Sequence, residues 1–246
     1  TVYSGQTMSV MLYLDQWNGN ETPGVAPYIR TCHDKALHID GYTKLIQYQW
    51  IQVTYTIPDT NGDVIDEIGL ILEGYAPGKF KTLGNVYLDE FTISGKGSYT
   101  INPKKQTKNF AAITPFSMDH GAWDLYGGTL NLMRCEPAFA YTGNYYARNY
   151  RYSATVIPRH GNSHLLLGRA LGAQKAYLAG LGAPGKAVIL KNDFGFTSLA
   201  EIDFSWTQDT AYEIAMEFTG NRIQLSIDGQ PLLSVTDDSF DHGMIG

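Results

Sequence analysis

The strictest constraint on the fold is a two-residue alternation of apolar and polar side chains between residues 212 and 235. This period is that of a β-strand with one buried face, whereas a helix repeats every 3.6 residues. Two short glycine-containing turns divide the passage into three runs, so it predicts a three-stranded antiparallel meander. The apolar positions are Tyr212, Ile214, Met216, Phe218, Ile223, Leu225 and Ile227, and the turns are Thr219-Gly220-Asn221 and Asp228-Gly229.

A second stretch, HLLLGRALGAQKAYLAGLGAPGKAVILK from His164 to Lys191, has the composition of an amphipathic helix interrupted by glycines and one proline. Each interior glycine costs a helix about 1 kcal/mol relative to alanine, and a proline costs about 3 kcal/mol. Favourable side-chain pairs contribute only about 0.2–0.5 kcal/mol each. We therefore predict strands at residues 164–169, 176–180 and 187–191, separated by turns at 172–174 and 182–185.

The first half of the chain shows the same alternation in shorter runs. Met8, Val10, Leu12 and Leu14 share one face of a predicted strand. In the run YQWIQVTYTIP, the residues Ile51, Val53, Tyr55 and Ile57 share one face, and Trp50, Gln52 and Thr54 share the other. Because no segment sustains a helical period over three turns, helix is expected to be a minority state.

A polar stretch rich in lysine, GKGSYTINPKKQTKNFAAIT at residues 95–114, is the best boundary within the chain. Short strands with turns between them are typical of sandwiches and jelly rolls. We predict an all-β protein with two antiparallel β-sandwich (jelly-roll) modules in tandem. The predicted modules span residues 1–97 and 108–246, with a linker at 98–107.

Charge and hydropathy argue against two classes of partner. The net charge is −6 and no long run of lysine or arginine occurs, which argues against nucleic-acid binding. No apolar run approaches the roughly 20 residues of a membrane-spanning helix. The 17 Tyr, 10 Phe and 4 Trp suit twisted sheets, and they also suit carbohydrate-binding faces, because a flat ring offers apolar area with a polar edge.

The second half resembles the laminin G-like, concanavalin A-like β-sandwich of many extracytoplasmic and carbohydrate-active proteins. The resemblance is carried by the order of motifs: the arginine-containing strand HLLLGRA, then AYLAGL, VILK, AYEIAM, GNRIQLSIDG and finally DDSFDHGMIG. It covers about residues 110–246. The resemblance implies a secreted or periplasmic location.

The first half resembles the galactose-binding-like jelly-roll module of carbohydrate-binding proteins, through WIQVTYTIP, GDVIDEIGLIL and GNVYLDEFTISG. The first strands of such a module are expected to lie outside this sequence. With ITPFSMDHGAWDLYGGTL at the join, the two halves together look like the C-terminal β region of bacterial ADP-ribosylglycohydrolase-family proteins. The helical, dimetal-binding catalytic domain of that family is not visible here, so its activity carries over to no residue.

Carbohydrate binding requires rings for stacking and a few polar groups on an open face. In the first module the candidates are Tyr13, Trp17, Tyr28, Arg30 and Trp50, with Trp17 expected in a loop. In the second module Arg169 and Tyr177 lie on neighbouring predicted strands, with Trp206 nearby. A guanidinium within an apolar strand is costly unless it faces an open groove or a carboxylate. A buried salt bridge to Glu201, Asp203 or Glu213 is therefore the alternative for Arg169.

Two further motifs suggest catalysis or metal binding. EIDFSW resembles the start of the signature of retaining β-glucanases, with Glu201 and Asp203 present, but the position of the acid/base holds Ser205 or Trp206. The acids and His242 of TDDSFDH could bind calcium, although an acidic turn is the commoner explanation. The jelly-roll resemblance implies that Asp89 helps to hold a structural calcium ion; no other cofactor is predicted.

These observations favour a non-catalytic accessory region, carbohydrate-binding, of a larger bacterial hydrolase that is ADP-ribosylglycohydrolase-like or a glycoside hydrolase. Its partner would be a glycan or the catalytic domain of the same chain. Two alternatives stay open: a glycoside hydrolase on a concanavalin A-like fold, and a structural spacer or interaction domain. No complete catalytic motif occurs, so the sequence leaves enzymatic activity undecided.

Overall fold

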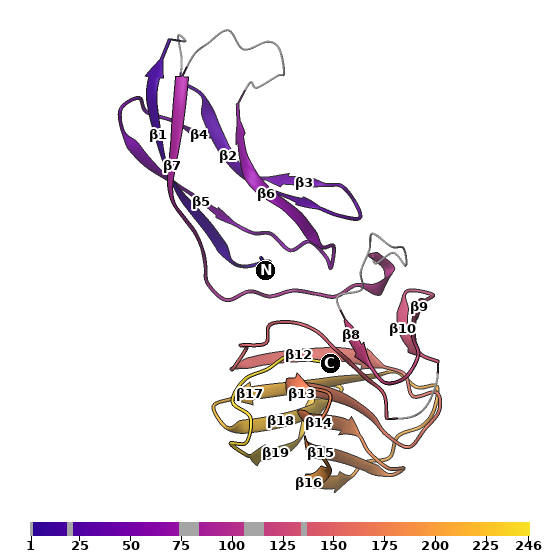
Figure 1. Ribbon diagram of the computed structural model, residues 1–246. Coiled ribbons are helices and arrows are strands. Elements are labelled where there is room, and N and C mark those ends of the chain that lie inside the picture. The colour runs from indigo at the N-terminus through magenta and orange to yellow at the C-terminus, as the bar shows by residue number, and fades with distance from the viewer. Residues whose placement is uncertain (1, 19–21, 74–83, 106–115, 134–136) are drawn as a thin grey trace. The chain divides into compact units, whose positions relative to one another are not determined.

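The computed structural model describes residues 2–18, 22–73, 84–105, 116–133 and 137–246, and these residues form antiparallel sheets with one short 3₁₀-helix at Pro103–Lys105. The predicted all-β fold is confirmed (Figure 1). Contacts divide the chain into a first unit of residues 1–107 with 127–129, and a second unit of residues 108–126 with 130–246. The module boundaries read from the sequence stay predictions, and part of the predicted linker lies outside the described residues.

The first unit is built from two sheets. One has the strand order β5-β1-β7; in the other, β2 pairs with β3, β4 and β6. Alternation along β1 buries Met8, Val10, Leu12 and Leu14, the face that the sequence predicted to be apolar. The strands are β1 (Thr7–Trp17), β2 (Gly24–Thr31), β3 (Leu37–Ile39), β4 (Thr43–Lys44), β5 (Trp50–Thr56), β6 (Ile65–Leu72) and β7 (Gly84–Ser94).

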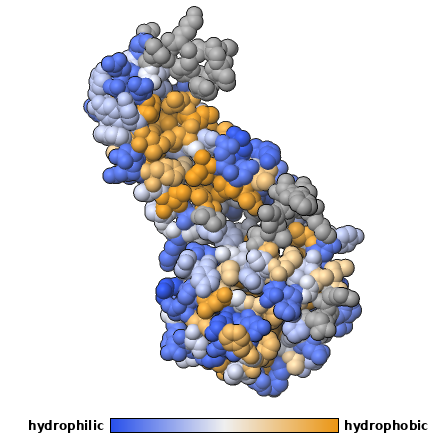
Figure 2. Space-filling view, viewed as in Figure 1, coloured by the Kyte–Doolittle hydropathy of each residue, from blue (hydrophilic) through white to orange (hydrophobic). Residues whose placement is uncertain are grey.

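The apolar face of β7 is not covered among the described residues. Leu88 pairs with Leu12 of β1, yet Leu88 is 54% exposed and Leu12 only 1%. Val86 and Phe91 of the same strand are exposed as well. Figure 2 shows apolar residues gathered on this unit around β6. The core of the first unit therefore ends at β1 and does not extend to the edge strand.

The second unit is a sandwich of two four-stranded sheets, ordered β13-β14-β15-β16 and β12-β17-β18-β19, with a shared apolar core. Two small hairpin-like pairs, β9 with β10 and β8 with β11, complete it. The strands are β8 (Ser117–Asp119), β9 (Trp123–Tyr126), β10 (Thr129–Leu132), β11 (Phe139–Tyr141), β12 (Tyr150–Val156), β13 (His164–Gly172), β14 (Lys175–Leu181), β15 (Lys186–Asp193), β16 (Phe196–Asp203), β17 (Tyr212–Thr219), β18 (Arg222–Ile227) and β19 (Gln230–Thr236).

Both sequence predictions for this unit are confirmed. Residues 212–236 form the meander β17-β18-β19, and residues 164–193 form the strands β13, β14 and β15. A glycine shows why one position of the second stretch carries no larger side chain. A Cβ added at Gly168 would lie 2.3 Å from the ring of Phe218, which belongs to the opposite sheet. The small residue thus permits the two sheets to approach.

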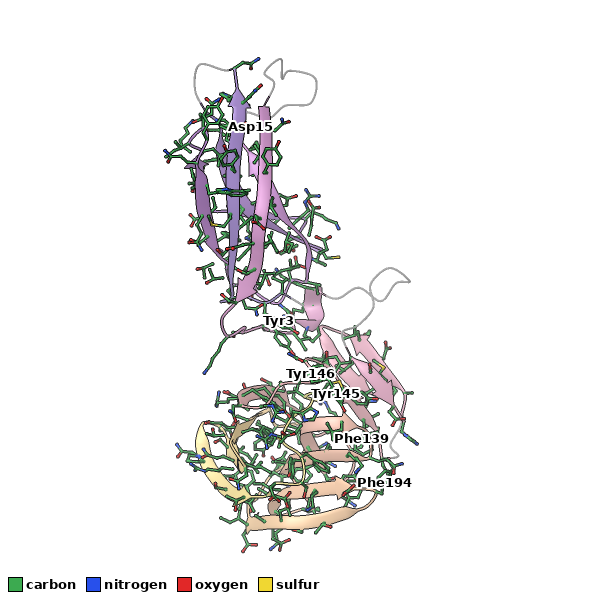
Figure 3. All side chains as sticks on the ribbon, turned by 60° about the vertical axis from the view of Figure 1, so that its left-hand side comes forward. Tyr3, Asp15, Phe139, Tyr145, Tyr146 and Phe194 are labelled. Atoms are coloured by element: carbon green, nitrogen blue, oxygen red, sulfur yellow. The ribbon has the colours of Figure 1, made fainter. Side chains whose placement is uncertain are left out.

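The outer face of β13-β14-β15 is also covered. Leu167, Ala170, Ala176 and Leu178 are buried there, and Phe139 of β11 (labelled in Figure 3) and Met244 pack against them. Backbone hydrogen bonds in both directions between Ala170 and Met244 attach the C-terminal segment to this face. The second unit therefore encloses both faces of one of its sheets.

Candidate functional site

Three aromatic rings lie side by side on the outer face of the sheet β5-β1-β7. Tyr13 of β1 is directly opposite Trp50 of β5 on one side and Tyr87 of β7 on the other. Ring centroids are 5.3 Å apart for Tyr13 and Trp50, and 6.2 Å apart for Tyr13 and Tyr87. Trp50 is 49% exposed and Tyr87 51% exposed. We call these three residues the aromatic row.

The row follows from strand pairing. Side chains alternate between faces along each strand, so residues that are paired in register point to the same side. Because Leu12 and Leu14 on either side of it point into the core, Tyr13 must point outward and its partners with it. Neighbouring rings are inclined by 43° and 53°.

Polar groups accompany the rings on the same face. Met11 of β1 is paired with Gln52 of β5 and with Asp89 of β7. The amide of Gln52 donates a hydrogen bond of 2.8 Å to the hydroxyl of Ser9. Asp15 follows Tyr13 at the next outward position of β1 and is labelled in Figure 3. The face thus combines flat apolar rings with amide, hydroxyl and carboxylate groups.

The structure places Trp17 differently from the sequence prediction. Trp17 is the last residue of β1, not a loop residue, and it is half-buried against the core around Leu12 and Leu14. The pairing of β1 with β7 shifts between Leu14 and Trp17, which is the signature of a β-bulge. The irregularity interrupts the alternation, so Trp17 does not join the aromatic row.

Asp89, predicted to help hold calcium, lies on the exposed side of β7. One of its carboxylate oxygens accepts the backbone N–H of Glu90 at 2.8 Å. Glu90 has a positive φ of 49°, and the β1–β7 pairing shifts beside it, so a bulge presents Asp89. Within the described parts of the chain, no group of three carboxylate, imidazole or thiol ligands includes Asp89. The calcium ion stays a prediction.

His33, Asp34 and Asp63 form a cluster that sequence reasoning did not identify. Both oxygens of Asp63 accept backbone N–H groups, those of His33 and Asp34, at 2.9 and 2.8 Å. Lys105 forms an ion pair with Asp34 at 2.5 Å. The hydrogen bond from Lys105 first, and that from His33 second, lower the pKa of Asp34. These contacts account for the cluster as a turn-stabilising network.

In the second unit, the prediction that Arg169 faces an open groove is wrong, because its side chain is buried and the residue is only 2% exposed. The guanidinium donates hydrogen bonds to the backbone carbonyls of Arg148, Phe240 and Gly220. It also lies 4.9 Å from the ring of Phe218. The alternative of a buried salt bridge to Glu201, Asp203 or Glu213 is not observed either, since carbonyl oxygens take the place of a carboxylate.

A β-bulge explains how an arginine in an apolar strand points inward. The pairing of β13 with β14 shifts between Gly168 and Gly172, and Arg169 has a positive φ of 48°. Its backbone N–H, freed from the ladder, donates 2.6 Å to the hydroxyl of Tyr150. Burial lowers the pKa of the guanidinium, and the convergent carbonyls stabilise its charge.

Tyr177 is likewise completely buried, so its predicted place on an open face is wrong. Its hydroxyl donates a hydrogen bond of 2.5 Å to the carboxylate of Asp237, which also accepts one of 2.9 Å from the ammonium of Lys191. Burial first, and the hydrogen bond to Asp237 next, raise the pKa of Tyr177 to about 12. Burial alone would raise the pKa of Asp237, but hydrogen bonds from Ser239, Tyr177 and Lys191 hold it well below its usual range.

Trp206 also has a structural environment. It is half-buried, packs against the core of the second unit and donates its indole N–H to the carbonyl of Gly182 at 3.2 Å. Its ring meets that of His164 edge to face, with centroids 5.4 Å apart. These contacts stabilise the turn after β14 and leave little of the ring for a ligand.

The acids of EIDFSW lie on the exposed side of β16. Lys186 contacts both Glu201 at 3.5 Å and Asp203 at 2.8 Å. The hydrogen bond from Lys186 lowers the pKa of Asp203, whereas a glycosidase needs one carboxyl with a raised pKa as its acid. The arrangement suits a solvent-facing ion-pair group better than a catalytic pair.

Comparisons with known proteins return β-sandwiches and no family assignment. No protein-family model matches the chain, and no curated protein does. The carbohydrate-binding module CBM66 from Bacillus subtilis is similar over 54% of this chain and 85% of its own, with 19% identity and a TM-score of 0.49. Domains LG4-5 of the mouse laminin alpha1 chain are similar over 100% of this chain and 76% of theirs, with 13% identity and a TM-score of 0.24.

Among the helices of the described residues, none has the length and apolarity to cross a membrane.

Proposed function

We propose that this chain is a non-catalytic carbohydrate-binding region whose first unit binds a glycan on the aromatic row. The observation that carries the proposal is the in-register placement of Tyr13, Trp50 and Tyr87 on one exposed sheet face. An exposed ring stacks on the apolar C–H face of a sugar, and adjacent amide and carboxylate groups hydrogen-bond its hydroxyls. Gln52, Asp15 and Asp89 supply such groups.

The inclination of the rings indicates what kind of glycan fits. Because successive rings are turned by 43° and 53°, one flat sugar cannot lie parallel to all three. A chain of sugars that turns along its length can place successive rings on successive side chains. The row therefore favours an oligosaccharide over a monosaccharide.

The sequence resemblance supports a finer proposal about the whole protein. We infer an accessory region of a bacterial hydrolase, ADP-ribosylglycohydrolase-like or a glycoside hydrolase, that works outside the cytoplasm. In that setting, binding a polymer keeps an attached catalytic domain close to its substrate. The alternative roles, a hydrolase or a structural spacer, find no comparable arrangement of exposed side chains in the described residues.

Titration calorimetry with the full chain tests the binding proposal. Glucan, xylan, mannan, galactan and chitin oligosaccharides of two to six sugars serve as probes. For at least one series, affinity should rise with chain length and then level off. Trp50→Ala should weaken binding of the longer members at least about tenfold, which corresponds to ~1.4 kcal/mol.

A matched control is Tyr48→Ala, since Tyr48 is 59% exposed but lies outside the row. This variant should bind as the wild type does. If no oligosaccharide binds, the binding proposal fails and the role of a structural spacer is favoured. If Trp50→Ala binds normally, the site lies elsewhere.

A further inference from the structure

The second unit presents its own exposed aromatic group, on loops and not on a sheet. Tyr145 and Tyr146 follow β11, and His242 lies in the C-terminal segment. Figure 3 shows the two tyrosines next to one another at the margin of the unit. None of these residues was a predicted glycan contact, and His242 was considered only as a calcium ligand. We call the three side chains the loop cluster.

The rings of the loop cluster have defined mutual positions. Tyr145 and Tyr146 meet edge to face, with centroids 5.3 Å apart and planes at 86°. Tyr146 is nearly parallel to His242, with an angle of 12° and centroids 6.2 Å apart. Tyr146 is 77% exposed and Tyr145 41% exposed. The ring of Tyr146 is thus exposed to solvent beside two other aromatic rings.

Backbone hydrogen bonds hold the two loops together. Thr142 and Ile245 exchange bonds of 2.7 and 2.9 Å, and the N–H of Gly243 donates 2.9 Å to the carbonyl of Ala147. Gly243 has a φ of 144°, and a Cβ there would lie 2.3 Å from the carbonyl carbon of Arg169. Only glycine permits this close approach. The loop cluster is therefore pre-organised by the fold.

The buried Arg169 supports the same loops from beneath. Its guanidinium donates hydrogen bonds to the carbonyls of Arg148, just after Tyr146 in the chain, and of Phe240, just before His242. The side chain of Asn144 accepts the backbone N–H of Tyr146 at 2.9 Å and fixes the turn. Arg169 is thus a positioning residue for these loops.

Charged planar groups border the rings. Asp241 forms an ion pair with Arg148, and its carboxylate lies 2.5 Å from Nδ1 of His242. The side chains of Arg148 and Asp241 are 64% and 59% exposed. A guanidinium and a carboxylate offer paired donors and acceptors to vicinal hydroxyls. Rings and planar polar groups in one pre-organised place have the chemistry of a sugar site.

We propose that the loop cluster is a second glycan-binding site, in which a sugar stacks on Tyr146 and its hydroxyls contact Arg148 and Asp241. The ligand class rests on the proposed function of the first unit, but the residues are independent of the aromatic row. The exposed ring accommodates the end or a branch of a glycan, because the perpendicular Tyr145 limits the flat area to a single sugar.

Affinity gel electrophoresis of the full chain tests this proposal. The probes are soluble xylan, glucomannan, galactan, amylopectin and β-1,3-glucan. We compare the wild type, Tyr146→Ala, Trp50→Ala and the double variant, and Tyr146→Phe retains the ring as a matched control. Thermal melting verifies that each variant is folded, as expected for a substitution at a residue that is 77% exposed.

We expect Tyr146→Ala to reduce retardation by at least one polymer about threefold or more, whereas Tyr146→Phe should not. The double variant should lose the retardation that remains in Trp50→Ala. If Trp50→Ala abolishes retardation and Tyr146→Ala changes nothing, the second site is refuted while the aromatic row stands. If only Tyr146→Ala has an effect, the row is refuted and the loop cluster stands. If no polymer retards the wild type, both fail.

Discussion

The two units display their aromatic side chains in opposite ways. In the first, the exposed rings of the aromatic row stand on strands, on the open face of β5-β1-β7. In the second, the sheet rings Tyr177 and Phe218 are buried, and the exposed ring of Tyr146 stands in a loop. The difference arises because Tyr177 and Phe218 point into the core between the two sheets of the second unit, whereas the rings of the aromatic row point away from the core of the first unit.

The comparison teaches that a tyrosine within a strand indicates a ligand face only where nothing covers the sheet. Tyr13 and Tyr177 occupy similar mid-strand positions in the sequence, yet one is half-exposed and the other fully buried. The face decides between them, because Tyr177 points toward the opposite sheet and Tyr13 points away from the core. Variants that loosen the loops above Arg169 in the second unit, or that test whether residues of the first unit are exposed in solution, sharpen this contrast.

The largest effect is expected from Arg169→Ala, which removes the donor group beneath the covering loops. Three carbonyls lose their donor and a buried side chain is removed, so the free energy of unfolding of the second unit should fall by at least about 3 kcal/mol. Hydrogen-exchange mass spectrometry should show faster exchange in peptides of β17 and β18, and no change in peptides of β1.

The matched control for this variant is Arg151→Ala, an exposed arginine on β12. Its effect on stability should stay within about 0.5 kcal/mol. Equal effects of the two substitutions would contradict a special role for the buried guanidinium.

The next contrast lies within the first unit, between two leucines that pair across β1 and β7. Leu12→Ala should cost about 2–5 kcal/mol because it leaves a cavity in a packed core. Leu88→Ala should cost less than about 1 kcal/mol, since Leu88 is 54% exposed. Urea denaturation monitored by hydrogen exchange in β5 measures both. A large cost for Leu88→Ala would mean that β7 is covered in solution.

A smaller, pH-dependent effect is expected from Asp237→Asn. The folded state holds the pKa of Asp237 well below its value in the unfolded chain, so the stabilisation is fully present above the unfolded pKa. This stabilisation is lost as pH falls from the unfolded pKa through the folded pKa, because the unfolded state takes up a proton at a higher pH than the folded state does. The wild type should therefore melt higher than Asp237→Asn at pH 7, and the difference should narrow below about pH 4.

Melting temperatures from pH 7 to pH 2 measure this difference. A gap that stays constant over the whole range would show that Asp237 contributes through packing and not through its charge. The contacts with Tyr177 and Lys191 then carry no electrostatic stabilisation.

The smallest effect on stability is expected at the aromatic row. Trp50→Ala removes a ring that is half-exposed and contacts only the neighbouring tyrosine among the described rings, so stability should change by no more than about 1 kcal/mol. Thermal melting checks this. A larger loss of stability would show that the aromatic row stabilises the sheet. Weaker glycan binding by Trp50→Ala would then reflect the destabilised sheet as well as the missing ring.

Much of the geometry of the proposed glycan site was accessible from the sequence. Alternation in YQWIQVTYTIP places Trp50 and Gln52 outward, and the pattern of residues 6–14 places Tyr13 outward as well. Tyr87 was missed although GNVYLDEF alternates, because the bulge at Glu90 obscures the phase of that strand. Trp17 was misassigned for a related reason, since a bulge before it turns the ring toward the core.

By itself, the sequence determined the β-strands, because side-chain period and glycine cost act over a few residues and do not depend on distant contacts. It also determined which face of β1 and β5 is apolar. Only the tertiary structure decided which faces are covered. Arg169 and Tyr177 form hydrogen bonds with Phe240 and Asp237, which lie 71 and 60 residues further along the chain, and the bulge at Arg169 aims its guanidinium at the carbonyl of Phe240. Burial depends on such long-range packing, which no local pattern encodes.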